Sequence, residues 1–281
     1  MIIAVASGKG GTGKTTVAVN IALSLDNVQF LDCDVEEPNA HIFLKPRIEK
    51  TILSSIPVPE IDTKKCVYCG KCAEVCVYNA IAIVPPTNNN AGVALTLTNL
   101  CHGCQACSFF CPKGAIRERK KEIGVVEFGS KKDIEFIHGR LNIGEAMAPP
   151  VIRQVKGHIN PRKTVIIDAP PGVSCPVIAA VKDSDFCLLV TEPTPFGLSD
   201  LSLAVELLHK LRVPFGVIIN RADLGDKETE RYCEKEKIEI LMKIPFNKEI
   251  ALAYSRGEAV VNVLPEYKTK FKDLFQKIAH R

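Results

Sequence analysis

The sequence predicts an α/β fold with a mostly parallel, doubly wound sheet, into which a smaller α+β domain is inserted. Short apolar segments alternate with helical patterns over most of the chain, which is typical of parallel sheets covered on both faces. A glycine-rich loop, GKGGTGKTT at residues 8–16, follows the first apolar segment. Where the alternation is interrupted, eight of the twelve cysteines occur in two runs of one spacing.

At 281 residues the chain has room for two domains. We predict a larger domain at 1–59 and 119–281 and an insert at 60–118. The strands expected in the larger domain are 2–6, 29–32, 165–168, 187–191, 216–220 and 239–244. The helices expected there include 14–25, 199–211, 227–237 and 267–280.

The borders of the insert come from two changes in composition. The alternation stops near Ser54, where IPVPEID is expected to be an extended linker, and resumes after the charged stretch Arg117 to Glu122. The two cysteine runs begin at Cys66 and Cys101, 35 residues apart, and end in similar segments, which predicts an internal repeat. Between the runs, 80–84 and 93–98 are expected to form a hairpin around PPTNNNAG.

The glycine-rich loop has the phosphate-binding pattern known as a P-loop, which is Gly8, then four residues, then Gly13-Lys14-Thr15. Its glycines expose backbone N–H groups to phosphates, Lys14 neutralises the β/γ oxygens and the Thr15 hydroxyl can hold Mg²⁺. Because a strand precedes the loop and a helix follows it, we predict a nucleotide site. Its residues are Gly8, Gly10, Gly11, Thr12, Gly13, Lys14, Thr15 and Thr16.

Two aspartates at predicted strand ends are expected to complete this site. Asp34 follows the second strand and Asp168 ends a later one, and ligands of open α/β sheets bind beyond the carboxyl ends of strands. We expect Asp168 to hold the Mg²⁺ shell and Asp34 to orient the attacking water or a metal-bound water. A lone aspartate after an apolar run is more often a helix or turn cap, but two of them beside a P-loop favour the catalytic interpretation.

The cysteine spacing, C-x2-C-x2-C-x3-C, is that of the bacterial ferredoxin run, in which the fourth cysteine of each run binds the other cluster. It predicts two 4Fe-4S clusters with crossed ligands. The first would be held by Cys66, Cys69, Cys72 and Cys111, and the second by Cys101, Cys104, Cys107 and Cys76. Zinc is the alternative, but zinc sites usually use paired C-x2-C arms without a third cysteine at the same step.

The motifs GKGGTGKTT, LDCDVEEPN, VIIDAPPG, VIINR and IPFNKEIALAYSRGEAV resemble those of the MinD/ParA/Mrp group of P-loop ATPases over nearly everything outside the insert. The resemblance implies ATP as the nucleotide and a homodimer formed on ATP binding, in which Lys9 reaches the partner's nucleotide. It also implies that Asn220 contacts adenine and that Gly172 lies on a switch segment. From the residues alone, Lys9 is equally a solvated loop lysine and Asn220 a strand-end turn residue.

The insert resembles a dicluster ferredoxin over its whole length. It departs from the pattern at Val77, where a proline is usual after the fourth cysteine, whereas Pro112 keeps the proline in the second run. His102, next to a ligand, is either a hydrogen-bond donor to its cluster or a loop residue facing water. Cys175 is expected either to face its copy across a dimer or to be a small buried hydrophobe, as Cys33, Cys187 and Cys233 are.

Charge and hydropathy limit the partners. The formal net charge is +4, but each 4Fe-4S cluster with its thiolates contributes about −2, so the loaded protein is close to neutral and nucleic-acid binding is not expected. The longest apolar runs are strand-sized and the chain starts directly in a strand, without an export leader, so we expect a cytoplasmic protein with reduced cysteines. The last helix either packs into the core or is a basic amphipathic membrane anchor. The basic run beginning at Arg117 is either a docking site for an acidic electron carrier or merely solvated.

These inferences predict an ATP-hydrolysing iron-sulfur protein in which Lys9, Lys14, Asp34 and Asp168 act in catalysis. Nucleotide state would be coupled to electron transfer or to assembly of a metallocofactor, with an electron donor, acceptor or assembly client that the sequence does not identify. The alternatives are a MinD-like spatial organiser whose clusters sense redox state, and a passive ferredoxin with a degenerate ATPase.

Overall fold

The computed structural model describes residues 1–280 and divides into two compact units. The first comprises Met1–Ile52, Val126–Arg140 and the chain from Val151 onward, and the second comprises Leu53–Val125 and Leu141–Pro150. The expected insert, 60–118, falls inside the second unit.

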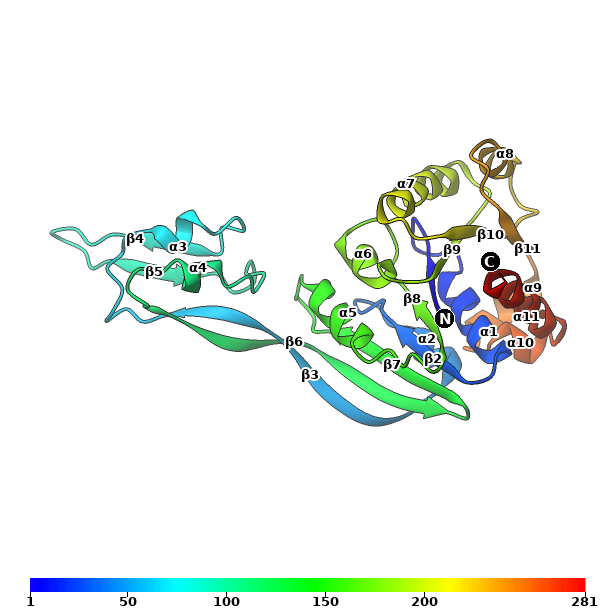
Figure 1. Cartoon of the computed structure of the whole chain (residues 1–281), viewed down its shortest axis with the longest axis horizontal. Coiled ribbons are helices and arrows are strands. Elements are labelled where there is room, and N and C mark those ends of the chain that lie inside the picture. The colour runs from blue at the N-terminus through cyan, green and yellow to red at the C-terminus, as the bar shows by residue number, and fades with distance from the viewer. Residues whose placement is uncertain (281) are drawn as a thin grey trace. The chain divides into compact units, whose positions relative to one another are not determined.

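The first unit is built on a mostly parallel sheet (Figure 1). The order of strands in the whole sheet is β11-β10-β9-β1-β8-β2-β7-β6-β3, and the pairs from β11 to β7 are parallel. These seven strands are β1 (Ile2–Ala6), β2 (Val28–Asp32), β7 (Ile134–Leu141), β8 (Thr164–Asp168), β9 (Phe186–Thr191), β10 (Phe215–Asn220) and β11 (Ile240–Ile244). All six strands predicted for the larger domain are present, each with ends within one residue of the predicted ones.

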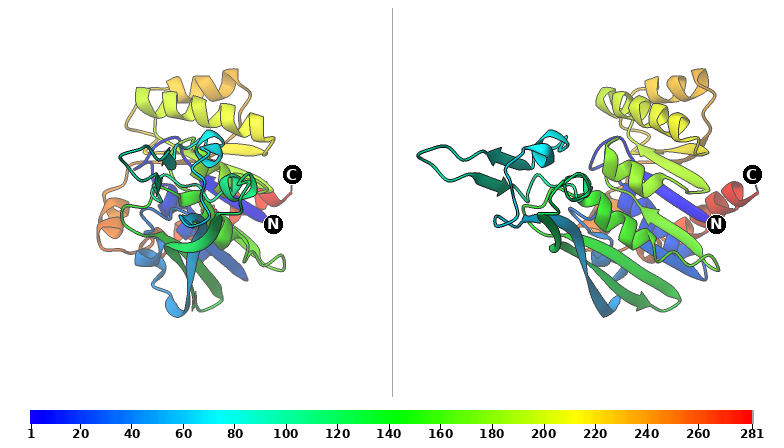
Figure 2. Two further views of the ribbon diagram at one scale, coloured as in Figure 1. Left: turned by 90° about the vertical axis from the view of Figure 1, so that its left-hand side faces the viewer. Right: turned by 60° about the vertical axis from the view of Figure 1, so that its left-hand side comes forward.

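Helices cover both faces of this sheet, so its apolar strands are buried on both sides. One face carries α1 (Lys14–Ser24), α2 (Ala40–Leu44), α9 (Lys248–Ser255), α10 (Val260–Val263) and α11 (Glu266–Ala279). The other helices of the unit are α6 (Cys175–Val181), α7 (Pro195–Leu211) and α8 (Glu228–Lys235), with α5 (Ala148–Lys156) running in from the second unit. The yellow α7 and the red α11 lie on opposite sides of the sheet (Figure 2).

The last helix packs into the core. Its apolar stripe, Phe271, Leu274 and Ile278, is buried in the cluster that also holds Val17 and Ile21 of α1. Core docking, one of the two alternatives for this helix, is therefore what the structure shows. Among the described residues, no helix has the length and hydropathy needed to cross a bilayer.

One expectation about the borders of the insert was wrong, and the charged stretch at the other border is a strand that was not predicted. The segment IPVPEID is not a linker but the end of β3 (Arg47–Ile61), and the charged stretch lies within β6 (Ile116–Lys131). Pro57 and Pro59 are tolerated because β3 is the last strand in the sheet order, where a missing N–H leaves no ladder bond unmade. The charged residues of β6 are mostly exposed. This part of the strand therefore contains no continuous apolar run by which it could be recognised in the sequence.

The second unit contains two short helices, α3 (Lys71–Glu74) and α4 (Ala106–Phe109), and an antiparallel pair, β4 (Ile81–Val84) and β5 (Val93–Thr96). The predicted hairpin around PPTNNNAG is confirmed by the register, which pairs Val84 with Val93. The predicted repeat is present in the backbone, because α3 and α4 start 35 residues apart. Positive φ values recur at the same offset, in the pairs Tyr68/Gly103, Gly70/Gln105 and Asn79/Gly114.

Candidate functional site

The glycine-rich loop joins β1 to α1. Gly13, the residue before α1, has φ 94°, a conformation that favours glycine, and a Cβ there would lie 2.5 Å from Nδ2 of Asn220. The same Nδ2 donates to the carbonyl of Thr12 at 2.8 Å. The loop is therefore held from the end of β10 and leads into the N-terminus of α1, where backbone N–H groups favour anions.

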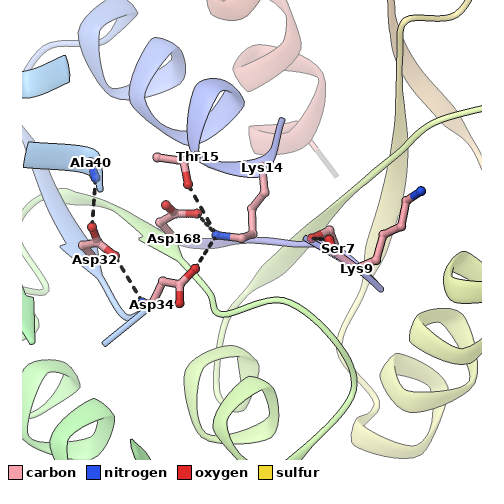
Figure 3. A network of polar contacts seen from close by, with 8 residues as sticks. All are labelled: Ser7, Lys9, Lys14, Thr15, Asp32, Asp34, Ala40 and Asp168. Atoms are coloured by element: carbon pink, nitrogen blue, oxygen red, sulfur yellow. Dashed lines mark hydrogen bonds and ion pairs between the residues drawn. The ribbon is translucent and has the colours of Figure 1, made fainter. Parts of the chain in front are cut away.

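Lys14 lies at the centre of a buried group of acids (Figure 3). Its Nζ is 2.7 Å from Oδ1 of Asp168, 3.5 Å from Oδ2 of Asp34 and 3.5 Å from Oγ1 of Thr15. Burial alone would lower the pKa of Lys14, but the charges of Asp168, Asp34 and neighbouring Asp32 outweigh it and raise that pKa. The lysine is thus a firmly charged group that links the P-loop to two strand ends.

Asp32 has a structural part in this arrangement. Its carboxylate accepts hydrogen bonds from the backbone N–H groups of Asp34 and Ala40, both at 3.1 Å, and so fixes the turn between β2 and α2. Burial, together with the charge of Asp168, raises the pKa of Asp32 well above its usual range. Asp32 was not among the predicted site residues.

A cavity of about 450 Å³ opens over the loop. Of the predicted residues, it is lined by Gly10, Gly11, Gly13, Lys14, Thr15, Thr16, Asp34 and Asn220. The rest of its lining includes apolar and aromatic side chains, among them Phe246, Tyr254 and Tyr267. A lining that combines a polar glycine-rich loop with aromatic side chains fits a ligand that joins phosphates to a flat ring.

Five of the predicted residues do not line the cavity. Thr12 is buried, and its carbonyl accepts the hydrogen bond from Asn220. Asp168 is fully buried beneath Lys14, and Gly8 packs against Asp200, whose carbonyl oxygen would lie 2.2 Å from an added Cβ. Gly172 has φ 95° and borders the site through its neighbour Pro171. Lys9 points away from Lys14, and its Nζ lies 3.8 Å from Oε2 of Glu192 (Figure 3).

Sequence reasoning missed two polar residues of this region. Asn39 lines the cavity, and its Oδ1 is buried with no hydrogen-bond partner in the part of the chain that the structure describes. Glu192 is buried and pairs with Arg221 at 2.7 Å in addition to Lys9. The signal for Asn39 was its place in LDCDVEEPN, whereas Glu192 follows its strand without any motif.

The acid cluster predicts how stability depends on pH. Burial, helped by the charge of Asp168, raises the pKa of Asp34 to about 6 from 3.8. Between these two pH values Asp34 keeps its proton in the folded protein but has released it in the unfolded chain. The contribution of Asp34 to the free energy of unfolding therefore falls as pH rises from about 4 to about 6. We expect Asp34→Asn to remove about 2–3 kcal/mol of this fall, measured by urea unfolding across the window. An unchanged slope in the variant would show that Asp34 is not the group that titrates.

The eight clustered cysteines line two pockets in the second unit. Pocket A is lined by Cys66, Cys69, Cys72 and Cys111, and pocket B by Cys76, Cys101, Cys104 and Cys107. In each pocket three cysteines come from one run and the fourth from the other. The two groups have the same membership as the crossed ligand sets expected from the spacing.

Backbone N–H groups donate to a matching pair of sulfurs in each pocket. In pocket A, Cys66 Sγ accepts from Tyr68 N at 3.4 Å and Cys111 Sγ from Ala115 N at 3.3 Å. In pocket B, the corresponding bonds are made to Cys101 Sγ at 3.4 Å and to Cys76 Sγ at 3.2 Å. Such donors stabilise thiolates, which is the form that binds a metal.

Burial raises the pKa of the Cys72 thiol, and it raises that of Cys107 to about 11. Outside the pockets, Cys33, Cys187 and Cys233 are fully buried, as predicted, whereas Cys175 is exposed at the start of α6. Among the residues that the structure describes, no three His, Cys, Asp or Glu side chains form a group that could hold a single metal ion.

Comparisons with known proteins place this geometry in context. The family model described as CobQ/CobB/MinD/ParA nucleotide binding domain matches residues 3–260. A relative from Methanocaldococcus jannaschii, an uncharacterized protein, is 31% identical over 271 residues, which cover 92% of this chain and 91% of the relative. A protein of Pyrococcus horikoshii named iron-sulfur cluster carrier protein is 25% identical over 305 residues, covering 99% of this chain and 85% of its own.

Solved structures share the fold. The cell division ATPase MinD of Pyrococcus furiosus aligns with a TM-score of 0.59 and 19% identity, covering 99% of this chain and 98% of its own. At that identity the likeness concerns the fold alone.

Proposed function

The chain belongs to the CobQ/CobB/MinD/ParA nucleotide-binding family, and from that premise we propose that it is an ATPase which also carries two 4Fe-4S clusters and couples nucleotide state to electron transfer or metallocofactor assembly. The proposal rests on one observation. The same chain contains a P-loop lysine, Lys14, that is paired with two aspartates, and two pockets that are each lined by four cysteines. The relatives named iron-sulfur cluster carrier protein add support for a role in assembly.

The part of the proposal that concerns ATP depends on a change of ion-pair partners at Lys14. Its ammonium group now neutralises Asp168 and Asp34, and incoming β- and γ-phosphates would compete for the same charge. Lys14 would then neutralise the phosphates and release both carboxylates. Asp34, lining the cavity, would orient the attacking water, and Lys9 would act across a dimer after leaving Glu192.

The residues present fit a magnesium ion. Oδ2 of Asp168 is buried without a hydrogen-bond partner among residues 1–280, which is costly for a carboxylate oxygen unless a cation or water satisfies it. Asp168 and the Thr15 hydroxyl would hold Mg²⁺ and its water shell, as oxygen ligands suit this hard cation. When bound, the ion supplies charge neutralisation for the phosphates.

The cysteine pockets fit iron-sulfur clusters. Each offers four thiols with two N–H···S hydrogen bonds, and soft thiolates are the ligands that such clusters use. When bound, a 4Fe-4S cluster takes up and releases single electrons at low potential.

The chain itself gives a route for coupling. After Asp34, whose turn is fixed by Asp32, the chain passes through α2 and enters β3, which continues into the second unit. It returns through β6 and β7, and His138 of β7 pairs in register with Asp32 of β2. The turn after Asp32 and strand β7 therefore both lie beside the nucleotide site, where Lys14 would change partners.

The coupling is tested by timing electron loss. Anaerobically isolated protein is reduced and mixed with a one-electron acceptor, with MgATP, with MgADP or without nucleotide. We expect MgATP to change the oxidation rate about fivefold or more, the size of an ordinary allosteric coupling, and Asp34→Asn to blunt the difference between MgATP and MgADP. Identical rates in all three conditions would discard the coupling, even if nucleotide and iron both bind.

A further inference from the structure

The internal repeat lets the two cysteine pockets be compared position by position. Of the thirteen residues that line pocket B, eleven have a counterpart 35 residues away in the lining of pocket A. The four cysteines match, as do the alanines Ala80 and Ala115 and the isoleucines Ile81 and Ile116. The backbone N–H donors to sulfur match as well, so they affect both pockets alike. What remains is a difference in side chains.

Five of the matched positions carry different residue types. Given with the pocket B residue first, they are Glu118 and Ile83, Ala106 and Lys71, Tyr78 and Lys113, Gln105 and Gly70, and His102 and Val67. Pocket A therefore has two lysines in its lining and pocket B has one glutamate.

The glutamate of pocket B is held in place by partners that pocket A lacks. The Ser108 hydroxyl and the Gln105 amide donate to the two carboxylate oxygens of Glu118. The corresponding residues in the other half of the repeat are Ala73 and Gly70, which have no side-chain donor. The carboxylate is consequently fixed beside pocket B.

The lysines of pocket A are only partly neutralised. Lys71 pairs with Glu74 at 3.4 Å, and both side chains are more than half exposed, so this contact compensates the charge incompletely. Lys113 makes no ion pair within residues 1–280. Positive charge remains at pocket A.

We infer that the two pockets give their centres different reduction potentials, with the higher potential at pocket A. The inference rests on the proposed function, because it concerns clusters in both pockets. A cluster gains one negative charge on reduction, which Lys71 and Lys113 favour and Glu118 opposes. An electron delivered to the centre in pocket B therefore passes to the centre in pocket A. The pocket B centre is oxidised and the pocket A centre is reduced, and no proton moves and no bond is made or broken. A weak one-electron reductant leaves its electron at pocket A.

The test is a redox titration of the full-length protein loaded with iron and sulfide, followed by electron paramagnetic resonance. We expect two reduction steps, with the first electron favouring one centre about tenfold or more, which corresponds to about 59 mV. Glu118→Gln should raise the lower potential and leave the higher one in place, and Lys71→Gln with Lys113→Gln should lower the higher one. Lys120→Gln is the control, since it removes a charge from the same strand outside both pocket linings and should move neither potential selectively.

Three outcomes count against the inference. Equal potentials in the wild-type protein overturn it, as does a Glu118→Gln variant that shifts both steps together or shifts neither. These results leave the proposed function standing, because both clusters are then present and titrate. A wild-type preparation that takes up no iron and shows no signal overturns the inference together with the iron-sulfur half of the proposed function. Iron content, measured on each variant beside the titration, separates a change of potential from loss of a cluster.

Discussion

Replacing Lys14 with alanine is expected to reduce ATP hydrolysis by about 10²–10³-fold, the loss that follows removal of one group that stabilises charge in a transition state. In the proposed mechanism Lys14 neutralises the β- and γ-phosphates, and no other lysine among residues 1–280 lines the cavity. The measurement is phosphate release by anaerobically purified protein with MgATP. Hydrolysis at the wild-type rate would show that the glycine-rich loop is not where ATP reacts.

The same change is expected to destabilise the nucleotide-free protein by about 3–5 kcal/mol, because it leaves buried carboxylates without their cation. Asp168 is fully buried and bonded to Lys14 at 2.7 Å, and Asp34 and Asp32 lie in the same cluster. Lys14→Arg is the matched control. It keeps the charge, so it should restore most of the stability, while its larger planar group should not restore hydrolysis. Urea unfolding of the two variants separates the structural effect from the catalytic one.

The parts of the fold that could be predicted from the sequence share one physical property. Strands such as β1, β8 and β9 are buried on both faces, so they are continuous apolar runs that stand out from the helices. The strands β3 and β6 could not be recognised, because their outer residues are exposed and their pattern is charged or proline-containing. Strand β7, which follows β6 after two residues, was not recognised either.

The candidate site divides in a similar way. Residues expected to bind a ligand through the backbone or through fixed chemistry, such as Gly13, Lys14 and the clustered cysteines, occur in dense motifs that a single sequence reveals. Residues that act by position do not. Asn39 and Glu192 became candidates only when the fold placed one in the cavity and the other against Lys9. The imbalance of charge between the two cysteine pockets likewise depends on which side chains the repeat brings into each lining.

Paired cysteine substitutions are expected to show whether the ligands cross between the two runs. Cys66 and Cys111 line pocket A although they belong to different runs, so Cys66→Ala combined with Cys111→Ala should remove one cluster. Iron content should fall from about eight to about four atoms per chain, since each cluster holds four. Cys66 and Cys76 belong to the same run but line different pockets, so Cys66→Ala combined with Cys76→Ala should damage both clusters.

If each run instead held its own cluster, the two double variants would exchange their results, and the crossed assignment would be wrong. The comparison is internally controlled, because each protein has lost two thiols and shares Cys66→Ala with the other. Iron and sulfide analysis with visible absorption gives the cluster count, and unfolding of the first unit by urea shows whether each variant is still folded there. The crossed arrangement also explains why the halves of the repeat need one another: neither run alone supplies a full set of four thiolates to a pocket. Loss of either fourth cysteine, Cys76 or Cys111, should therefore destabilise the centre whose other three ligands lie in the opposite run.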